Sequence, residues 1–182
     1  MVYLFLANGF EEIEALTPVD VLRRVGVEVL TVSINEGTKK VMGAHGIEVS
    51  ADLTLDEYNE DTAEMIILPG GSEGTRNLEE NGRVREIILS AVKRELYVAA
   101  ICAAPTILAK LGLLRGLKAT CYPSLAGVLM DNGVKYKNDK VVCDKRFITS
   151  MGAGTSGEFA FKLVEKLLSV GEASNIRIAM VY

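Results

Sequence analysis

The sequence predicts an α/β fold in which a doubly wound, mainly parallel sheet carries helices on both faces and small antiparallel hairpins. Two features of the 182 residues indicate this fold. Short apolar runs rich in β-branched residues recur along the chain, as parallel strands do when both faces are buried. Amphipathic segments separate these runs, and strands that alternate with helices form parallel sheets. The length suits one core, so we expect a single domain over residues 1–182.

The first elements form a β-α-β unit. An apolar strand over residues 2–7 turns at Asn8-Gly9, which tolerates positive φ. A helix should follow, because glutamates crowd its first turns, where the positive end of the helix dipole stabilises carboxylates. Thr17-Pro18 should cap and restart or bend this helix, and Gly26 should end it. Residues 27–32 are rich in β-branched side chains and should form the second strand.

The middle of the chain should contain a hairpin made of residues 39–42 and 47–50, because turn signals surround both arms. An exposed hairpin is a common dimer element. Residues 54–57 should open a short helical or irregular segment. A buried strand at residues 64–68 should then end in the glycine-rich turn that begins at Gly70.

The second half should complete a sheet of the flavodoxin type. Its tail, from Glu172 onwards, shows no clear pattern. The elements expected here are a helix over 82–93, a strand over 96–101, a helix from Pro105 to Leu111, a short strand over 119–123, a helix capped by Ser124 and ending at Met130, a hairpin of residues 135–136 and 141–144, a strand over 147–150, and a helix opened by a capping box of Thr155 and Glu158.

Composition excludes several classes of partner. The net charge of −4 is scattered without blocks, and no basic stripe carries interleaved aromatics, so neither nucleic acid nor a membrane is an expected partner. The three cysteines form neither a disulfide framework nor a zinc pattern, which indicates a reducing compartment. We therefore expect a cytoplasmic protein that uses no metal and no cofactor. The N-terminus lacks the basic region of a secretory signal, and no apolar run could span a bilayer.

The candidate reactive group is Cys102, which stands between an apolar strand and a helix that begins at Pro105. A side chain in this bend lies at the carboxyl end of a strand, facing helix N–H groups that favour a thiolate. The small neighbours Ala100, Ala103 and Ala104 suit a sharp turn with an exposed nucleophile. The alternative is that Cys102 is a small buried hydrophobe, as most free cysteines are.

A second loop, at Gly70-Gly71, should reach the same sheet edge as Cys102. Adjacent glycines let backbone N–H groups approach a ligand, so this loop could supply oxyanion donors. Alternatively, the glycines only permit a tight turn. The loop lacks the Lys-Ser/Thr of a P-loop and the spacing of a dinucleotide fingerprint. We therefore rank nucleotide binding below a function that uses the Cys102 thiol. The glutamates at 11, 12 and 14 could join the same pocket from the end of the first strand.

Five segments together closely resemble the ThiJ/PfpI superfamily, and within it the branch of the parkinsonism-associated deglycase and its bacterial relatives. The resemblance covers nearly the whole chain, and its motifs are specific in combination. The segments are Gly9–Glu14, Thr17–Arg24, Leu68–Gly71, Ala99–Pro105 and Gly154–Ser156.

The resemblance implies a role for individual residues. Cys102 matches the nucleophile, and Glu14 matches a glutamic acid that is held protonated against the sulfur, where it can donate a charge-assisted hydrogen bond. Gly71 and Ala103 match positions whose backbone amides line the oxyanion site. Members of the family are usually homodimers with the pocket near the interface, which implies a homodimer here.

The sequence also departs from the family. The histidine found near the cysteine in this branch falls on Tyr122, a poor general base at pH 7 because a phenol has a pKa of about 10. The peptidase-like branch has a histidine where this chain has Ala103, so peptidase activity is not expected. His45, the only histidine, should be a surface residue of the hairpin turn; alternatively, it reaches the pocket of a neighbouring subunit. We regard Cys121 and Cys143 as structural.

Two functions follow from the resemblance and the reactive thiol. In the first, Cys102 adds to a reactive α-oxoaldehyde or its glycated adduct, and Glu14 moves protons until a hydroxy acid leaves, as in glyoxalases and deglycases that need no cofactor. In the second, the protein is a non-enzymatic oxidative-stress sensor or chaperone in which Cys102 is oxidised to a sulfinate that Glu14 stabilises.

Overall fold

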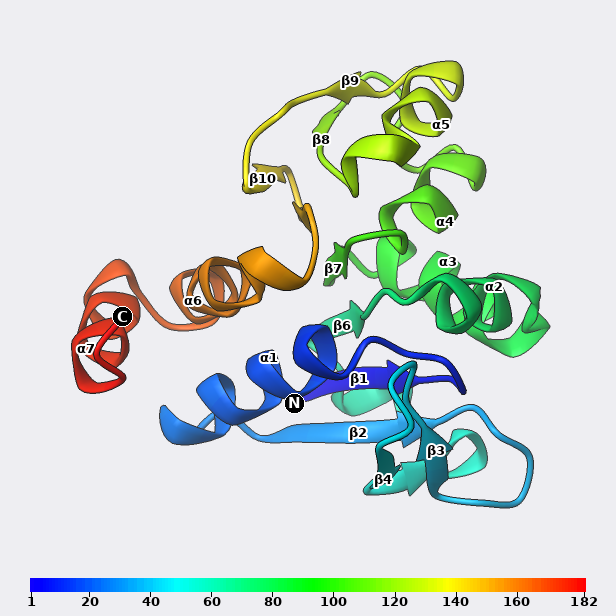
Figure 1. Cartoon of the computed structure of the whole chain (residues 1–182), viewed down its shortest axis with the longest axis vertical. Helices are drawn as coiled ribbons and strands as arrows, with labels where there is room; N and C mark the ends of the chain where they lie inside the picture. The colour runs from blue at the N-terminus through cyan, green and yellow to red at the C-terminus, as the bar shows by residue number, and fades with distance from the viewer.

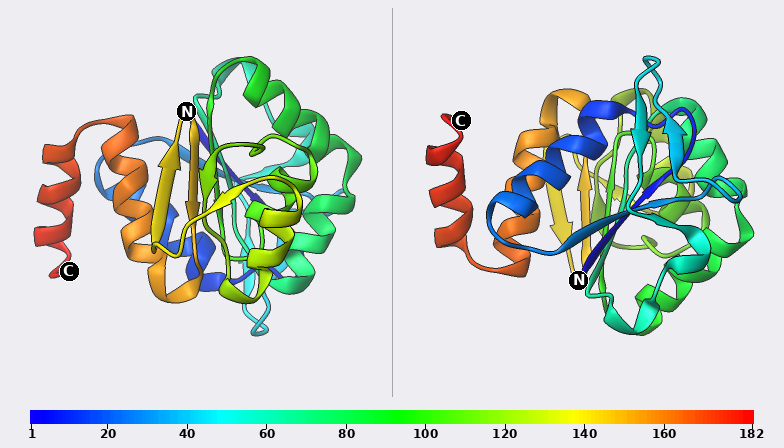
Figure 2. Two further views of the ribbon diagram at one scale, coloured as in Figure 1. Left: turned by 90° about the horizontal axis from the view of Figure 1, so that it is seen from above. Right: turned by 90° about the horizontal axis from the view of Figure 1, so that it is seen from below.

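A computed structural model describes residues 1–182 and shows a central sheet covered by helices on both faces (Figures 1 and 2). The strands are β1 (Val2–Leu6), β2 (Val29–Ser33), β3 (Lys40–Met42), β4 (Glu48–Ser50), β5 (Leu53–Thr54), β6 (Met65–Leu68), β7 (Tyr97–Ile101), β8 (Lys118–Ala119), β9 (Lys135–Tyr136), β10 (Val141–Asp144) and β11 (Phe147–Ser150). The helices are α1 (Glu12–Arg24), α2 (Ser72–Glu80), α3 (Gly82–Lys93), α4 (Pro105–Lys110), α5 (Ala126–Asp131), α6 (Ser156–Leu167) and α7 (Val170–Ala179).

The central sheet has seven strands in the order β10-β11-β7-β6-β1-β2-β5. All neighbours pair in parallel except β10, which runs antiparallel to β11 at one edge. The five longer parallel strands therefore follow the order 2-1-3-4-5, which is the flavodoxin arrangement. The predicted α/β class, with its mainly parallel sheet, is confirmed.

Alternate residues of each strand point to opposite faces of the sheet, which creates two apolar cores. On one face, Phe5 and Ile66 lie in a core that includes residues of α2, α3, α4 and α5. On the other face, Leu4 and Ile67 lie in a core with residues of α1, α6 and α7. Figure 2 shows α7, in red, standing outside α6 at the periphery. No helix is both long and apolar enough to cross a membrane.

Of the two outcomes predicted for Thr17-Pro18, the restart does not occur, since α1 runs through both residues as one helix. Pro18 removes one backbone donor, but the helix buries Val21 and Leu22 one turn later against the sheet. This continuous apolar face outweighs the lost hydrogen bond. The helix ends as predicted at Gly26, which has a φ of 77° and donates its N–H to the carbonyl of Arg23.

One of the two predicted hairpins is correct and the other is wrong. Strands β3 and β4 form the expected antiparallel hairpin, which projects from the sheet edge (Figure 2). Strand β9, in contrast, pairs in parallel with β8 and not with β10. The antiparallel partner of β10 is β11, with Val142 opposite Thr149. Sequence periodicity does not distinguish these partners, because both candidate pairs are joined by short polar turns.

Two predicted helix caps are also wrong. The Thr155 hydroxyl bonds to Ser150 and to the backbone of Gly152, and Glu158 pairs with Lys140 at 2.7 Å, so no capping box forms. Ser124 lies inside a 3-10 turn, Pro123–Leu125, that precedes α5.

Two helices, α2 and α7, were missed by the sequence patterns. Helix α2 begins at the glycine-rich loop, and Leu78 is the only large apolar side chain that it buries. Helix α7 occupies the tail, where the Ser169 side chain caps it by accepting the Glu172 N–H at 3.1 Å. It buries Ala173 and Ile176, an apolar pair too sparse to give a helical stripe.

Candidate active site

The candidate site lies where β1, β6 and β7 end side by side. These three strands are neighbours in the order β7-β6-β1, and their carboxyl ends carry the Cys102 bend, the Gly70-Gly71 loop and the start of α1. Segments separated by about 90 positions in the chain therefore meet at one sheet edge, as the β-α-β alternation predicted.

Cys102 occupies a strained turn between β7 and α4. Its φ is 64°, a left-handed conformation that costs a non-glycine residue about 1–3 kcal/mol. Neighbouring segments hold the turn, because the Cys102 N–H donates to the carbonyl of Ser150 at 2.9 Å and its carbonyl accepts the Tyr122 N–H at 2.8 Å. Strain maintained in this way is typical of functional sites, and it presents the thiol at the mouth of a cavity.

Glu14 lies in the first turn of α1, and its side chain is buried against Cys102. One carboxyl oxygen, Oε2, accepts the Gly70 N–H at 2.9 Å, and the carboxyl lies within reach of the Cys102 thiol, whose S–H can donate to it. Burial raises the pKa of Glu14 to about 7, although its hydrogen bonds with Cys102 and Gly70 oppose the rise. The carboxyl therefore keeps its proton until close to neutral pH.

The Cys102 thiol does not ionise as easily as the helix N-terminus alone suggested. Burial raises its pKa to about 12, and the negative charge of Glu14 contributes to this rise, while the backbone amides of Gly71 and Ala103 lower it. The effect of Glu14 depends on its own proton. When Glu14 is protonated its charge is absent and its O–H can donate to the sulfur, so the pair shares one negative charge above about pH 7.

The thiol opens into a cavity of about 300 Å³. Tyr122 lines the wall and is half exposed, as the sequence suggested for a pocket residue. The lining residues are Glu11, Gly71, Ser72, Cys102, Ala103, Tyr122, Ser124 and Leu125.

The structure separates the roles of the two adjacent glycines. The single N–H of Gly70 donates to Glu14, so Gly70 positions the carboxyl and is not the oxyanion donor that the sequence suggested. The Gly71 amide faces the sulfur. Gly71 has a φ of 92°, and a Cβ there would collide with the backbone of Gly9. The two glycines are thus needed for the tight turn and also because they let the Gly71 amide come close to Cys102.

Sequence reasoning missed Gly152, which closes the site from a fourth strand end. A Cβ at Gly152 would lie 3.3 Å from the Tyr122 ring, 3.8 Å from Glu14 Oε1 and 3.9 Å from Cys102 Sγ. Gly152 follows β11, the neighbour of β7, so the rule that parallel strands end at one edge could have identified it.

His45 lies outside the residues that line the cavity. Its ring Nδ1 is 2.8 Å from Glu12 Oε2 and 3.6 Å from Glu11 Oε1, and its backbone N–H donates to Glu12 Oε1 at 2.8 Å. These three side chains place potential metal ligands within 4.8 Å of one another, but the hydrogen bonds among them account for the arrangement without an ion. The contacts attach the β3–β4 hairpin to the start of α1.

We expect the substitution His45→Asn to leave unchanged the pH dependence of kcat/KM for the α-oxoaldehyde reaction that the sequence predicts. The hydrogen bond to Glu12 and the charge of Glu11 raise the pKa of His45, but its ring is held by its own chain and is not in the cavity wall. The measurement is a pH–rate profile of both proteins between pH 5 and pH 9. Loss of a limb in the variant would instead show that His45 titrates during catalysis.

The other two cysteines differ from Cys102 in their surroundings. Cys121 is fully buried, and its thiol donates weakly to the carbonyl of Tyr122 at 3.4 Å. Cys143 is half-buried on the edge strand β10. Burial raises the pKa of both thiols, and neither thiol has a carboxyl group as a hydrogen-bonding partner. This supports the interpretation that they are structural.

Comparison with known proteins identifies the family. Residues 1–166 match the sequence model of the DJ-1/PfpI family, and the match spans every strand end that forms the site. The chain belongs to the DJ-1/PfpI family. The resemblance seen in the sequence motifs is therefore confirmed over most of the chain.

Individual DJ-1/PfpI proteins are similar over nearly their whole length. The glutathione-independent glyoxalase DJR-1.2 of Caenorhabditis elegans is 38% identical over 157 residues, which cover 86% of this chain and 82% of that protein. Deglycase PH1704 of Pyrococcus horikoshii is 36% identical over 156 residues, or 82% of this chain and 89% of that one. A solved structure of oxidized DJ-1 from Toxoplasma gondii superimposes with a TM-score of 0.93 at 31% identity, covering 100% of this chain and 97% of that one.

Proposed function

We propose that this protein converts reactive α-oxoaldehydes, free or as glycated adducts, into hydroxy acids, with Cys102 as nucleophile and Glu14 as the group that moves protons. The observation that carries this proposal is the buried Glu14 carboxyl beside the thiol of a strained cysteine that faces a cavity. Relatives named as a glyoxalase and a deglycase support this chemistry. A peptidase is not proposed, because Ala103 follows the cysteine.

The reaction needs no redox partner, because it is an internal redistribution within the substrate. The Cys102 sulfur adds to the aldehyde carbon of methylglyoxal, and the oxygen that gains charge takes up a proton, giving a hemithioacetal. Transfer of the proton on that carbon to the neighbouring ketone carbon, through an enediol, gives a thioester. Water then cleaves the thioester, releasing lactate and the free thiol. Methylglyoxal and one water thus become lactic acid, with all atoms and electrons balanced.

Each step requires a group that can both give and accept a proton close to the sulfur. Glu14 has this property, since burial raises its pKa to about 7 and its carboxyl contacts the Cys102 sulfur. The Gly71 and Ala103 amides, which face the sulfur, can also stabilise the negative oxygen that forms beside it.

The proposal is tested by following methylglyoxal and its product by ¹H NMR, without added thiol or metal. We expect the purified protein to form lactate in amounts equal to the aldehyde consumed. The background is the same assay with the Cys102→Ser variant. Equal rates in the two samples would refute the enzymatic proposal.

A second candidate function, a sensor of oxidative stress or a chaperone controlled by oxidation, is favoured by the same contact. A sulfinate on Cys102 would carry oxygens that accept hydrogen bonds from protonated Glu14 and from the Gly71 and Ala103 amides. The similar Toxoplasma gondii protein was solved in an oxidized form. The first test of this candidate is the order in which the three cysteines are oxidised.

Mild peroxide is expected to add two oxygens to Cys102 before it modifies Cys121 or Cys143. Cys102 alone combines access to a cavity with a hydrogen-bonding acid and two backbone amides, whereas Cys121 is fully buried. Peptide mass spectrometry over a peroxide time course measures the order. Earlier oxidation of Cys121 or Cys143 would contradict the sensor role.

We also propose that the protein acts as a homodimer in the cytoplasm, with neither nucleic acid nor membrane as partner. Apolar side chains are exposed on α1 and on the hairpin that contacts it, namely Ile13, Met42 and Ile47. The hairpin and α1 are joined through Glu12 and His45, so these side chains are presented on one rigid unit. Light scattering of the purified chain measures its mass in solution.

A further inference from the structure

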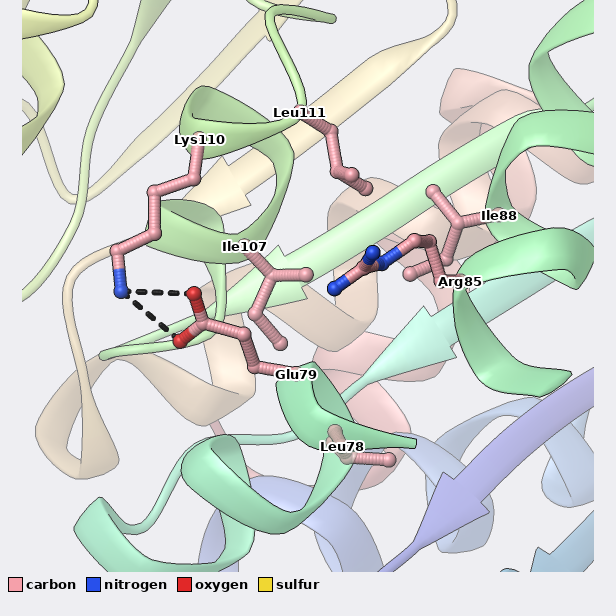
Figure 3. Close-up of a pocket in the computed structure, with 7 residues that line it drawn as sticks. All are labelled: Leu78, Glu79, Arg85, Ile88, Ile107, Lys110 and Leu111. Atoms are coloured by element: carbon pink, nitrogen blue, oxygen red, sulfur yellow. Dashed lines mark hydrogen bonds and ion pairs between the residues drawn. The ribbon is translucent and has the colours of Figure 1, made fainter. Parts of the chain in front are cut away.

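A second cavity, of about 210 Å³, lies between α2, α3 and α4 and shares no lining residue with the Cys102 cavity. Its floor is apolar, formed by four aliphatic side chains that Figure 3 shows converging on one space. These side chains are Leu78, Ile88, Ile107 and Leu111. Three of them are almost completely buried and lie in the same core as Phe5 and Ile66, so the floor is preformed.

The rim of this cavity carries three charged side chains, of which only two are paired. Lys110 Nζ lies 2.8 Å from Glu79 Oε1 and 2.9 Å from Oε2, a closed ion pair that joins α4 to α2. Arg85 comes from α3, and its guanidinium points across the cavity toward Ile107 with no hydrogen bond or ion pair drawn to it in Figure 3. Lys110 contacts both carboxylate oxygens of Glu79. Arg85 is therefore the one charged side chain on the rim that has no ion-pair partner.

We propose that this cavity binds a small carboxylic acid with a compact apolar body, in a role separate from the chemistry at Cys102. The planar guanidinium offers parallel N–H donors that match both oxygens of a carboxylate. The aliphatic floor removes the apolar body from water. The cavity is smaller than the 300–1,000 Å³ typical of sites for drug-sized ligands, so the ligand is about the size of a single aromatic ring with its acid group.

The test uses benzoate as the probe and the full chain, followed by ¹H–¹⁵N NMR at constant ionic strength. Saturable shifts are expected for backbone amides of α2, α3 and α4. The substitution Arg85→Gln should weaken benzoate binding about tenfold or more, since it removes a charged hydrogen-bonding partner. Arg83→Gln is the matched control, because Arg83 lies on the same helix but pairs with Glu86 outside this cavity, and its affinity should equal that of the wild type.

A third variant tests the sign of the electrostatic argument. Glu79→Gln removes the negative charge and frees Lys110, so benzoate should bind several times more tightly than to the wild type. Benzyl alcohol, which has the ring without the charge, should not saturate the site. The proposal is overturned if benzoate fails to saturate, if Arg85→Gln binds it as well as the wild type, or if benzyl alcohol binds equally tightly.

Discussion

Replacing Cys102 with serine is expected to lower kcat/KM for methylglyoxal by about 10³-fold or more. A hydroxyl at this position has no accessible anion, so the addition that begins the reaction is lost while the cavity remains. Serine is close to cysteine in size and keeps the backbone bonds to Ser150 and Tyr122, so the strained turn should persist. Steady-state kinetics measure the loss, and circular dichroism with thermal unfolding verifies the fold.

The matched control for this substitution is Cys143→Ser. Cys143 is also half-buried, but it lies on the edge strand β10 and not among the residues that line the Cys102 cavity. Its variant should retain wild-type activity. If both variants lost activity equally, or if Cys102→Ser stayed active, Cys102 would not be the nucleophile.

The Glu14→Gln variant should lower kcat by about 10²–10⁴-fold, the usual contribution of a positioned acid–base group. The amide can still accept the Gly70 N–H, so the loss reports proton transfer and not collapse of the site. In the wild type, kcat/KM should rise with pH through about 7, where the Glu14–Cys102 pair acquires its negative charge. In the variant this limb should move to higher pH, because the thiol must ionise alone while burial raises its pKa.

Glu14→Gln should also change how the free energy of unfolding depends on pH, because burial raises the pKa of Glu14 in the folded protein. The folded-state pKa of about 7 lies above the ordinary value of 4.5, so between these pH values the unfolded chain has lost the proton that the folded chain keeps. The contribution of Glu14 to the free energy of unfolding is therefore highest below pH 4.5, and it falls by about 3 kcal/mol as the pH rises to 7. Glu14→Gln should lack this decline.

Urea denaturation at pH 4.5 and pH 8 measures this difference. The exposed substitution Glu28→Gln is the control and should decline with pH as the wild type does. A Glu14→Gln variant with the wild-type decline would show that the carboxyl ionises freely in the folded protein, and the proposed proton carrier would lose its physical basis.

Much of the site was predictable because parallel strands end at one edge of a sheet. That rule, applied to the apolar runs before Gly70 and Cys102, placed both loops together, and the motifs around them identified the family. The same rule applies to Gly152, which follows a predicted strand. It was missed because a single glycine has no side chain that indicates a functional site. The difference between Gly70 and Gly71 could not be predicted, since it depends on which amide points toward Glu14.

The sequence by itself determined the α/β class and the family, because apolar periodicity and motif order are properties of the chain alone, and the family resemblance implied that Glu14 lies beside Cys102. Only the tertiary structure decided the partners of β9 and β10, the unbroken path of α1 through Pro18, and the helical tail. The ionisation of the Glu14–Cys102 pair was likewise decided only by the tertiary structure. Burial sets the pKa of Glu14 near 7 and opposes ionisation of the thiol, and burial depends on packing contacts between distant segments.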